Sequence, residues 1–138
     1  EHFAWVSQVF AGLQDYRALR FEEAQEKGWP VVRHMWLHYP SDMAAHESDD
    51  QFLLGSGFLV APVLEKCEGW FGCDSERDVY LPAGRWTHLW TGELHVGPIS
   101  LRVDAPMQQP PVFYLEDDPE AMDAVAKLRE LDVGVHDE

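Results

Sequence analysis

Short apolar segments separated by glycine- and proline-containing turns occupy the middle of the chain, and this alternation constrains the fold most. The segments are GFLVAPVL, RDVYLP, RWTHLWT, ISLRVDA and PVFYLE, all between residues 57 and 116. The turn signals between them are PAG, TGE and VGP. Short strands separated by such turns are typical of an antiparallel β-sandwich or barrel. We therefore predict a small antiparallel β domain, with GSG at residues 55–57 forming a bend before a strand.

Helical patterns flank this region on both sides. Apolar residues recur at steps of three and four near the start, namely Phe3, Val6, Phe10, Leu13 and Tyr16, then Leu19 or Arg20. This spacing predicts one helix with a single apolar face, continuing to a C-terminal cap at Gly28. Near the other end, Asp117 or Asp118 precedes Pro119 in DPEAMDAVAKLRELD. An acidic N-cap followed by proline at the first helical position predicts a terminal helix.

The segment GWPVVRHMWLHYPSD, residues 28–42, connects the first helix to the β region. Pro30 has no N–H and ends any helix that arrives from upstream. Val31 and Val32 favour extended chain, and Pro40 closes the segment. The pattern predicts a buried strand of about eight or nine residues with apolar side chains on both faces.

His34 and His38 are four residues apart in this segment, which on a helix would be metal-ligand spacing. On the predicted strand their positions are separated by about 13 Å, at about 3.3 Å per residue. Zinc ligands lie only about 2 Å from the ion. We therefore predict no metal site here, and instead two buried, hydrogen-bonded histidines.

Two parts of the chain are distinguished by these patterns. A helix, a short loop and a doubly apolar strand are the local pattern of α/β proteins with buried parallel strands. That pattern covers residues 1–41 and cannot make a domain alone. Residues 42–138 are predicted to form the β domain with its terminal helix.

Composition excludes some classes of function. A net charge of −15 and a pI near 4.6 argue against binding to nucleic acid, because no Lys/Arg cluster could neutralise phosphates. No apolar run approaches the roughly 20 residues that cross a bilayer. The chain begins at Glu1, without Met and directly before a helix, so we expect a sequence cut from a longer protein. Oligomeric state is not indicated.

Cys67 and Cys73 enclose a short loop, CEGWFGC. A disulfide across the loop would indicate a secreted or lumenal location, whereas two free thiols would fit the cytoplasm. Both states stay open, and the location with them, although the cytoplasm is slightly favoured. The spacing is too wide for a zinc or redox CxxC motif, and no second pair is present.

The sequence contains no complete set of catalytic residues. Asp49 and Asp50 are adjacent, so their side chains point in different directions and are predicted to serve a loop or a helix start rather than acid/base chemistry. No serine lies in a nucleophile-elbow pattern, and no glycine-rich phosphate loop is present. Trp86 and Trp90 are predicted to fill a core or an interface, while Trp70 is a candidate for an exposed contact residue.

Several stretches together resemble the C-terminal end of glycoside hydrolase family 31, the α-glucosidase and α-xylosidase family. These are GWPVVRHMWLHYPSD, DDQFLLGSGFLVAPVLE, RDVYLPAGRWTHLWTGE and VDAPMQQPPVFYLEDD. The end, PPVFYLEDD followed by a helix, is similar to the sulfoquinovosidase branch. The loop KCEGWFGCDSE is longer than is usual in the family.

The resemblance implies a fold and an activity. Residues 1–41 would be the last helix and strand of a (β/α)8 barrel, and residues 42–138 a β-sandwich packed on it. The complete enzyme would be a retaining α-glycosidase needing no metal or other cofactor, whose nucleophile and acid/base lie upstream of Glu1. The chain alone would be inactive. Its carbohydrate substrate would bind at the C-terminal ends of the barrel strands, so His38, at the rim of that pocket, is the candidate substrate-binding residue.

Two alternatives from other classes remain. The β domain could bind carbohydrate without catalysis, through tryptophan side chains. It could also serve only as a structural module that supports a barrel.

Overall fold

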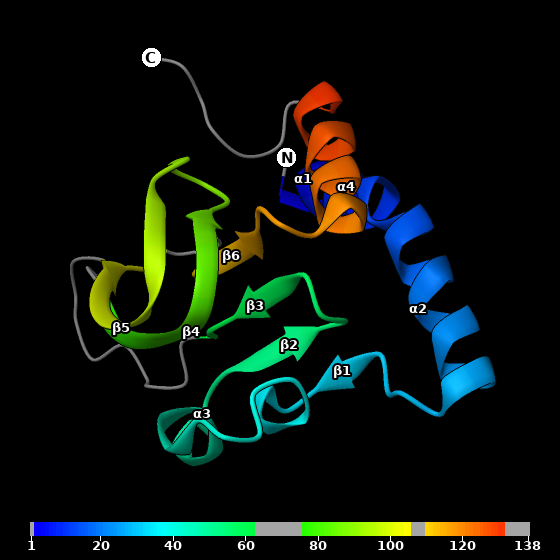
Figure 1. Ribbon diagram of the computed structural model, residues 1–138. Helices are drawn as coiled ribbons and strands as arrows, with labels where there is room; N and C mark the ends of the chain where they lie inside the picture. The colour runs from blue at the N-terminus through cyan, green and yellow to red at the C-terminus, as the bar shows by residue number, and fades with distance from the viewer. Residues whose placement is uncertain (1, 63–75, 106–109, 132–138) are drawn as a thin grey trace.

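The computed structural model describes residues 2–62, 76–105 and 110–131, with side chains from residue 7 onward. Four α-helices are present in these ranges, α1 (His2–Gly12), α2 (Gln14–Lys27), α3 (Met43–Glu47) and α4 (Pro119–Glu130), with one 3-10 turn, η1 (Met35–Leu37). The strands are β1 (Val32–Arg33), β2 (Phe52–Leu54), β3 (Phe58–Val60), β4 (Glu76–His88), β5 (Leu94–Asp104) and β6 (Val112–Leu115). Figure 1 shows α1, α2 and α4 gathered on one side of the molecule and the β4–β5 hairpin on the other.

The described strands form one six-stranded sheet in the order β1-β2-β3-β6-β4-β5. Every neighbouring pair is antiparallel, so the predicted antiparallel β region is confirmed. GSG at residues 55–57 is the turn between β2 and β3, as predicted. The second layer of a sandwich is not among the described residues, and that part of the prediction stays a prediction.

Strands β4 and β5 form a hairpin longer than the sequence pattern predicts. PAG and VGP are not turns between strands but lie opposite each other within the hairpin, where Gly84 pairs with Gly97. The register shifts between Leu81 and Gly84, which identifies a β-bulge. The bulge accommodates PAG and VGP without ending either strand. TGE, in contrast, does lie in the turn that connects the two strands.

The predicted strand of eight or nine residues after Pro30 is wrong. Extended pairing stops after Arg33, because His34 caps the 3-10 turn η1 by accepting a hydrogen bond from the Trp36 backbone N–H at 3.2 Å. The prediction of parallel pairing is also not met, since Val32 pairs antiparallel with Leu54 of β2.

The N-terminal segment is two helices rather than one, with the break at Leu13. Tyr16 and Arg20 are buried, but Phe10 is 64% exposed and Leu19 is 41% exposed, so the predicted apolar face is only partly correct. Arg20 is buried because its guanidinium pairs with Glu23 and with Glu120 of α4. Gly28 ends α2 in the left-handed conformation, as predicted for a cap.

The sheet separates two hydrophobic clusters. Phe58 and Tyr114 point to the cluster that includes Tyr16 and the apolar face of α4, whereas their neighbours Leu59 and Phe113 point to the other cluster, around Trp86. This follows from the alternation of side chains along a strand. The three long helices therefore cover one face of the sheet.

The terminal helix α4 begins as predicted. Asp118 is its N-cap, and its carboxylate accepts hydrogen bonds from the backbone N–H groups of Glu120 and Ala121. Its packing against α1 is close, because a Cβ added at Gly12 would lie 2.6 Å from the Leu128 side chain. No helix among the described residues is long and apolar enough to cross a bilayer.

Candidate functional site

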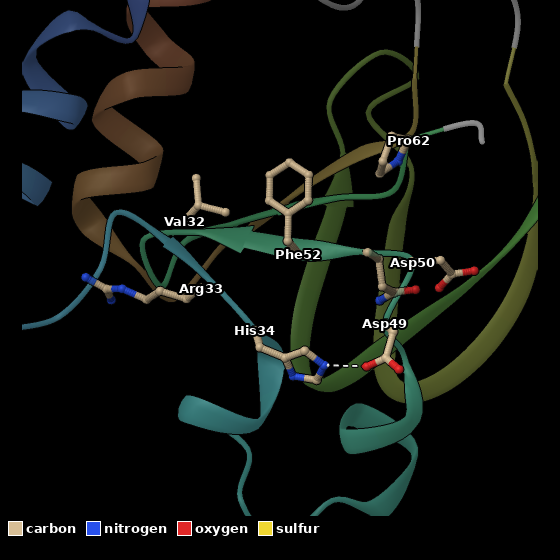
Figure 2. A pocket seen from close by; sticks show the side chains of 8 residues that line it. Val32, Arg33, His34, Asp49, Asp50, Phe52 and Pro62 are labelled. Atoms are coloured by element: carbon tan, nitrogen blue, oxygen red, sulfur yellow. Dashed lines mark hydrogen bonds and ion pairs between the residues drawn. The ribbon is translucent and has the colours of Figure 1, made fainter.

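A pocket of about 270 Å³ lies beside β1 and β2. It is lined by Val32, Arg33, His34, Asp49, Asp50, Gln51, Phe52 and Pro62. Figure 2 shows His34 reaching toward Asp49 in this pocket, while the Arg33 side chain points away from that pair. The pocket combines apolar side chains with one histidine and two carboxylates, which are groups capable of acid/base chemistry or metal binding when their lone pairs are free.

Both nitrogens of His34 are engaged. Nδ1 accepts the Trp36 backbone N–H at 3.2 Å, and Nε2 lies 3.1 Å from Asp49 Oδ1. Because Nδ1 accepts, the ring proton sits on Nε2 and donates to the carboxylate. His34 is hydrogen-bonded as predicted, although its side chain is only partly buried. With no lone pair available, it can act neither as a general base nor as a metal ligand.

The two adjacent carboxylates contact different partners. Asp49 accepts from His34, whereas Asp50 pairs with Arg77 at 3.0 Å. The Arg77 guanidinium also donates to the backbone carbonyls of Asp50 and Pro62, which fixes the loop between α3 and β2. The predicted loop role of these residues is confirmed, and they do not face each other as an acid/base pair would.

Gln51 also lines the pocket, and both polar atoms of its side chain are hydrogen-bonded. Its amide donates to the Tyr80 carbonyl at 2.6 Å, and its side-chain oxygen accepts the Tyr80 N–H at 3.0 Å. The Tyr80 hydroxyl donates to Asp42, and burial together with that carboxylate raises the pKa of Tyr80 to about 12. The pocket is thus a set of satisfied structural contacts rather than a reactive centre.

His38, the predicted rim residue, lies outside this pocket, in a cluster with Trp29 and Arg33. Its ring stacks on the Trp29 ring, with centroids 5.0 Å apart and planes 9° apart. Arg33 Nη1 lies 3.0 Å from His38 Nε2. Burial and then the Arg33 charge lower the pKa of His38, so the imidazole is neutral at pH 7.

Arg33 was not singled out from the sequence, yet its side chain holds this cluster together. It is 1% exposed, donates through Nε to the Pro30 carbonyl at 2.5 Å and pairs with Glu23. Burial raises the pKa of Glu23, but the hydrogen bond from Arg33 and the Arg20 charge outweigh this and lower it overall. The signal in the sequence was a charged residue inside an apolar segment, which needs a buried partner.

Trp86 and Trp90 serve packing, as predicted. Trp86 is fully buried and its Nε1 donates to the Pro82 carbonyl at 2.9 Å. Trp90 lies in the turn after β4, packs against the cluster beneath α4 and donates to the Pro110 carbonyl at 2.7 Å. Trp70, Cys67 and Cys73 lie outside the described residues.

Metal ligation has no support in the described part of the chain. No group of three or more His, Cys, Asp or Glu side chains there is arranged to hold an ion. The two histidines considered from the sequence contact separate partners, Asp49 and Arg33.

Comparison with known proteins decides the family. Residues 28–118 match the model of the glycosyl hydrolase family 31 C-terminal domain. The chain belongs to glycoside hydrolase family 31. The family 31 resemblance drawn from the sequence motifs is therefore confirmed.

Among its relatives are two bacterial sulfoquinovosidases. That of Agrobacterium fabrum (strain C58) is 36% identical over 117 residues, which cover 84% of this chain and 17% of the relative. That of Escherichia coli (strain K12) is 39% identical over 116 residues, covering 84% of this chain and 16% of the relative. The chain thus spans less than a fifth of the length of these family 31 enzymes.

Solved family 31 structures share the fold. A sulfoquinovosidase from E. rectale, in complex with an aza-sugar inhibitor, matches 98% of this chain and 19% of its own, with a TM-score of 0.84 and 36% identity. An α-xylosidase from a soil metagenome, complexed with xylose, matches 83% of this chain and 16% of its own, with a TM-score of 0.74 and 31% identity.

Proposed function

We propose that these residues are the C-terminal part of a retaining α-glycosidase whose two catalytic carboxylates lie upstream of Glu1. The observation that carries the proposal is the match to a family 31 C-terminal domain in enzymes about five times as long as this chain, of which it covers 16–19%. Retaining hydrolysis needs two carboxyl groups about 5–5.5 Å apart across the scissile bond. Asp49 and Asp50 are committed to His34 and Arg77 instead, so the chain alone is inactive.

The proposed architecture assigns residues 1–41 to the end of a (β/α)8 barrel and residues 42–138 to the adjoining β domain. Helices α1 and α2 fit this assignment, whereas β1 pairs antiparallel with β2 and lies within residues 28–118, which match the C-terminal domain. The coverage of 98% in the E. rectale enzyme includes this N-terminal part.

A direct assay tests where the chemistry lies. The 138-residue chain and the enzyme containing it are each incubated with a nitrophenyl α-glycoside. We expect turnover by the longer enzyme and only the buffer rate with the chain. Hydrolysis by the chain above that rate, abolished by Asp49→Asn, would contradict the proposal.

Within the family we propose sulfoquinovosides as the substrate class, since relatives with that name reach 36–39% identity over most of this chain. The test is the ratio of kcat/KM for aryl α-sulfoquinovoside, α-glucoside and α-xyloside on the longer enzyme. A preference for the glucoside or the xyloside would contradict this assignment and leave the glycosidase proposal intact.

A supporting role for the β domain is the second candidate, and it is compatible with the first. It is favoured by the contacts that join α4 to the N-terminal helices, Arg20 with Glu120 and Lys127 with Asp15. Carbohydrate binding by the isolated chain is the remaining alternative. Titration calorimetry with α-glucans is expected to show no heat, and binding lost in Trp70→Ala or Trp90→Ala would favour that alternative.

A further inference from the structure

Four side chains of alternating charge connect α4, α2 and β1. Glu120, in the first turn of α4, pairs with Arg20 of α2. One turn further along α2, Glu23 pairs with Arg20 at 3.3 Å and, through its other oxygen, with Arg33 of β1. We call these four residues the α2–α4 network. All except Arg33 lie outside residues 28–118, so the network joins the flanking helices to the part of the chain that matches the family domain.

The charges of the network balance, with two guanidinium groups and two carboxylates. Arg20 is 4% exposed and Arg33 is 1% exposed, so each cation needs negative charge from within the protein. Arg20 has no further acceptor to turn to, because its Nε is buried without a hydrogen-bond partner among the described residues. If the Glu120 charge were lost, Glu23 would have to balance both cations, and its contact with Arg33 would weaken.

Arg33 in turn holds residues 29–38 together. Its Nε donates to the Pro30 carbonyl at 2.5 Å, and its Nη1 lies 3.0 Å from His38 Nε2. Its guanidinium carbon lies 5.3 Å from the centroid of the Trp29 ring, on which His38 stacks. Figure 1 shows α2 extending from α1 and α4 to the loop before β1, so α2 connects α4 to this segment.

We propose that the α2–α4 network is a clamp through which the docking of α4 controls the conformation of residues 29–38. With Glu120 in place, Glu23 is available to Arg33 and the segment is held closed. When α4 is displaced or the Glu120 charge is removed, Arg20 competes for Glu23, and the segment opens locally while the sheet stays folded. The clamp goes beyond the proposed function, because it is a property of this chain whatever sugar the longer enzyme takes.

A second ion pair between the same two helices provides a matched control. Lys127 of α4 pairs with Asp15 of α2. Within the described residues, no hydrogen bond or ion pair joins either side chain to the α2–α4 network. Lys127→Gln therefore removes a contact between α4 and α2 and leaves the charges of the network unchanged.

Hydrogen exchange followed by mass spectrometry tests the clamp on the full 138-residue chain, at a concentration where it is monomeric. The reporters are the N–H groups of Leu37 and His38, which donate to the His34 carbonyl at 3.2 Å and the Met35 carbonyl at 3.1 Å. We expect Glu120→Gln to speed exchange in this peptide by at least about threefold and to leave β4 peptides at the parent rate. Lys127→Gln should leave both at the parent rate.

The path of the coupling is tested in a Glu23→Gln background. There Arg33 has already lost its carboxylate, so Glu120→Gln should cause no further increase. Parent rates at residues 37 and 38 in Glu120→Gln would overturn the proposal. An equal increase in Lys127→Gln, an increase that extends to β4, or one that persists in full without the Glu23 charge would overturn it too. The comparison of Glu120→Gln with Lys127→Gln decides the proposal even if Glu23→Gln does not fold.

Discussion

At the scale of single residues, Gly97 is the position where a side chain is least tolerated among the described glycines. A Cβ added there would lie 1.9 Å from the Pro82 carbonyl oxygen, which is backbone and cannot rotate away. We predict that Gly97→Ala lowers the free energy of unfolding by about 3 kcal/mol or more, as severe overpacking does.

Gly28→Ala is the matched control for that substitution. Gly28 has φ +75° but no atom within 4 Å of an added Cβ, so the cost is conformational only, about 1 kcal/mol. Urea unfolding followed by tryptophan fluorescence measures both. Equal losses in the two variants would show that the contact with Pro82 is not what excludes a side chain at residue 97.

Tyr16 connects α2 to the β2–β3 turn through its hydroxyl. The hydroxyl donates to the Leu54 carbonyl at 2.8 Å and accepts the Gly57 N–H at 3.1 Å. Tyr16→Phe leaves two backbone groups without a partner and should cost about 1–3 kcal/mol. Tyr39→Phe is the control, because that hydroxyl makes no hydrogen bond within the described residues. A cost below about 0.5 kcal/mol for Tyr16→Phe would contradict this prediction.

At the scale of elements, the turn between β4 and β5 depends on a neutral histidine. His88 Nδ1 accepts the backbone N–H groups of Trp90 at 3.2 Å and Thr91 at 3.3 Å. Burial and then the neighbouring His95 lower the pKa of His88, and the Glu93 carboxylate only partly offsets this. Because the folded pKa lies below the unfolded value, the unfolded chain binds more protons as the pH falls below about 6.5.

We therefore predict that the free energy of unfolding decreases between pH 7 and pH 5, in part through His88. His88→Asn keeps an acceptor near the Nδ1 position without a titrating group, so its stability should fall less over this range. Chemical denaturation at several pH values gives both slopes. Identical slopes in the variant and the parent would assign the dependence to other groups, such as His38.

Sequence patterns predicted elements where the determinants are local. The N-cap at Asp118, the C-cap at Gly28 and the strand around Phe113 follow from a few neighbouring residues. The short length of β1 could not be predicted in this way, because the His34 side chain caps η1 and so ends the strand pairing. The length of the β4–β5 hairpin could not be predicted either. PAG and VGP look like turns in the sequence, and only the pairing of Gly84 with Gly97 shows that they lie at a bulge within the hairpin.

The cluster around His38 shows why a site is harder to predict than an element. His38 was identified from its place after the strand, but Glu23 and Trp29, which help to position it, come from the end of α2 and the loop beyond. Such a cluster depends on how α2 packs against β1, and no local spacing encodes that packing.

At the scale of the whole molecule, exposed apolar side chains lie on the N-terminal helices. Phe10 is 64% exposed and Phe21 is 58% exposed, unusual for phenylalanine on a helix. In the proposed enzyme the preceding barrel elements would cover them. We predict that the isolated chain self-associates, and that the double variant Phe10→Ser, Phe21→Ser does so less, because apolar association scales with exposed area.

Sedimentation velocity over a range of concentrations measures this, with Met122→Ser on α4 as the control for an exposed apolar residue elsewhere. A chain that stays monomeric throughout, with no difference between the variants, would argue against a missing partner surface on these helices.

Helix α4 packs against α1 and α2, and the Leu128 side chain of α4 packs closely on Gly12 of α1. Helices α1 and α2 are thus synthesised well before the helix that covers them. Until residue 128 has emerged from the exit tunnel, Tyr16 and its neighbours lack that cover, and a nascent chain would rely on chaperones or on upstream segments to shield them.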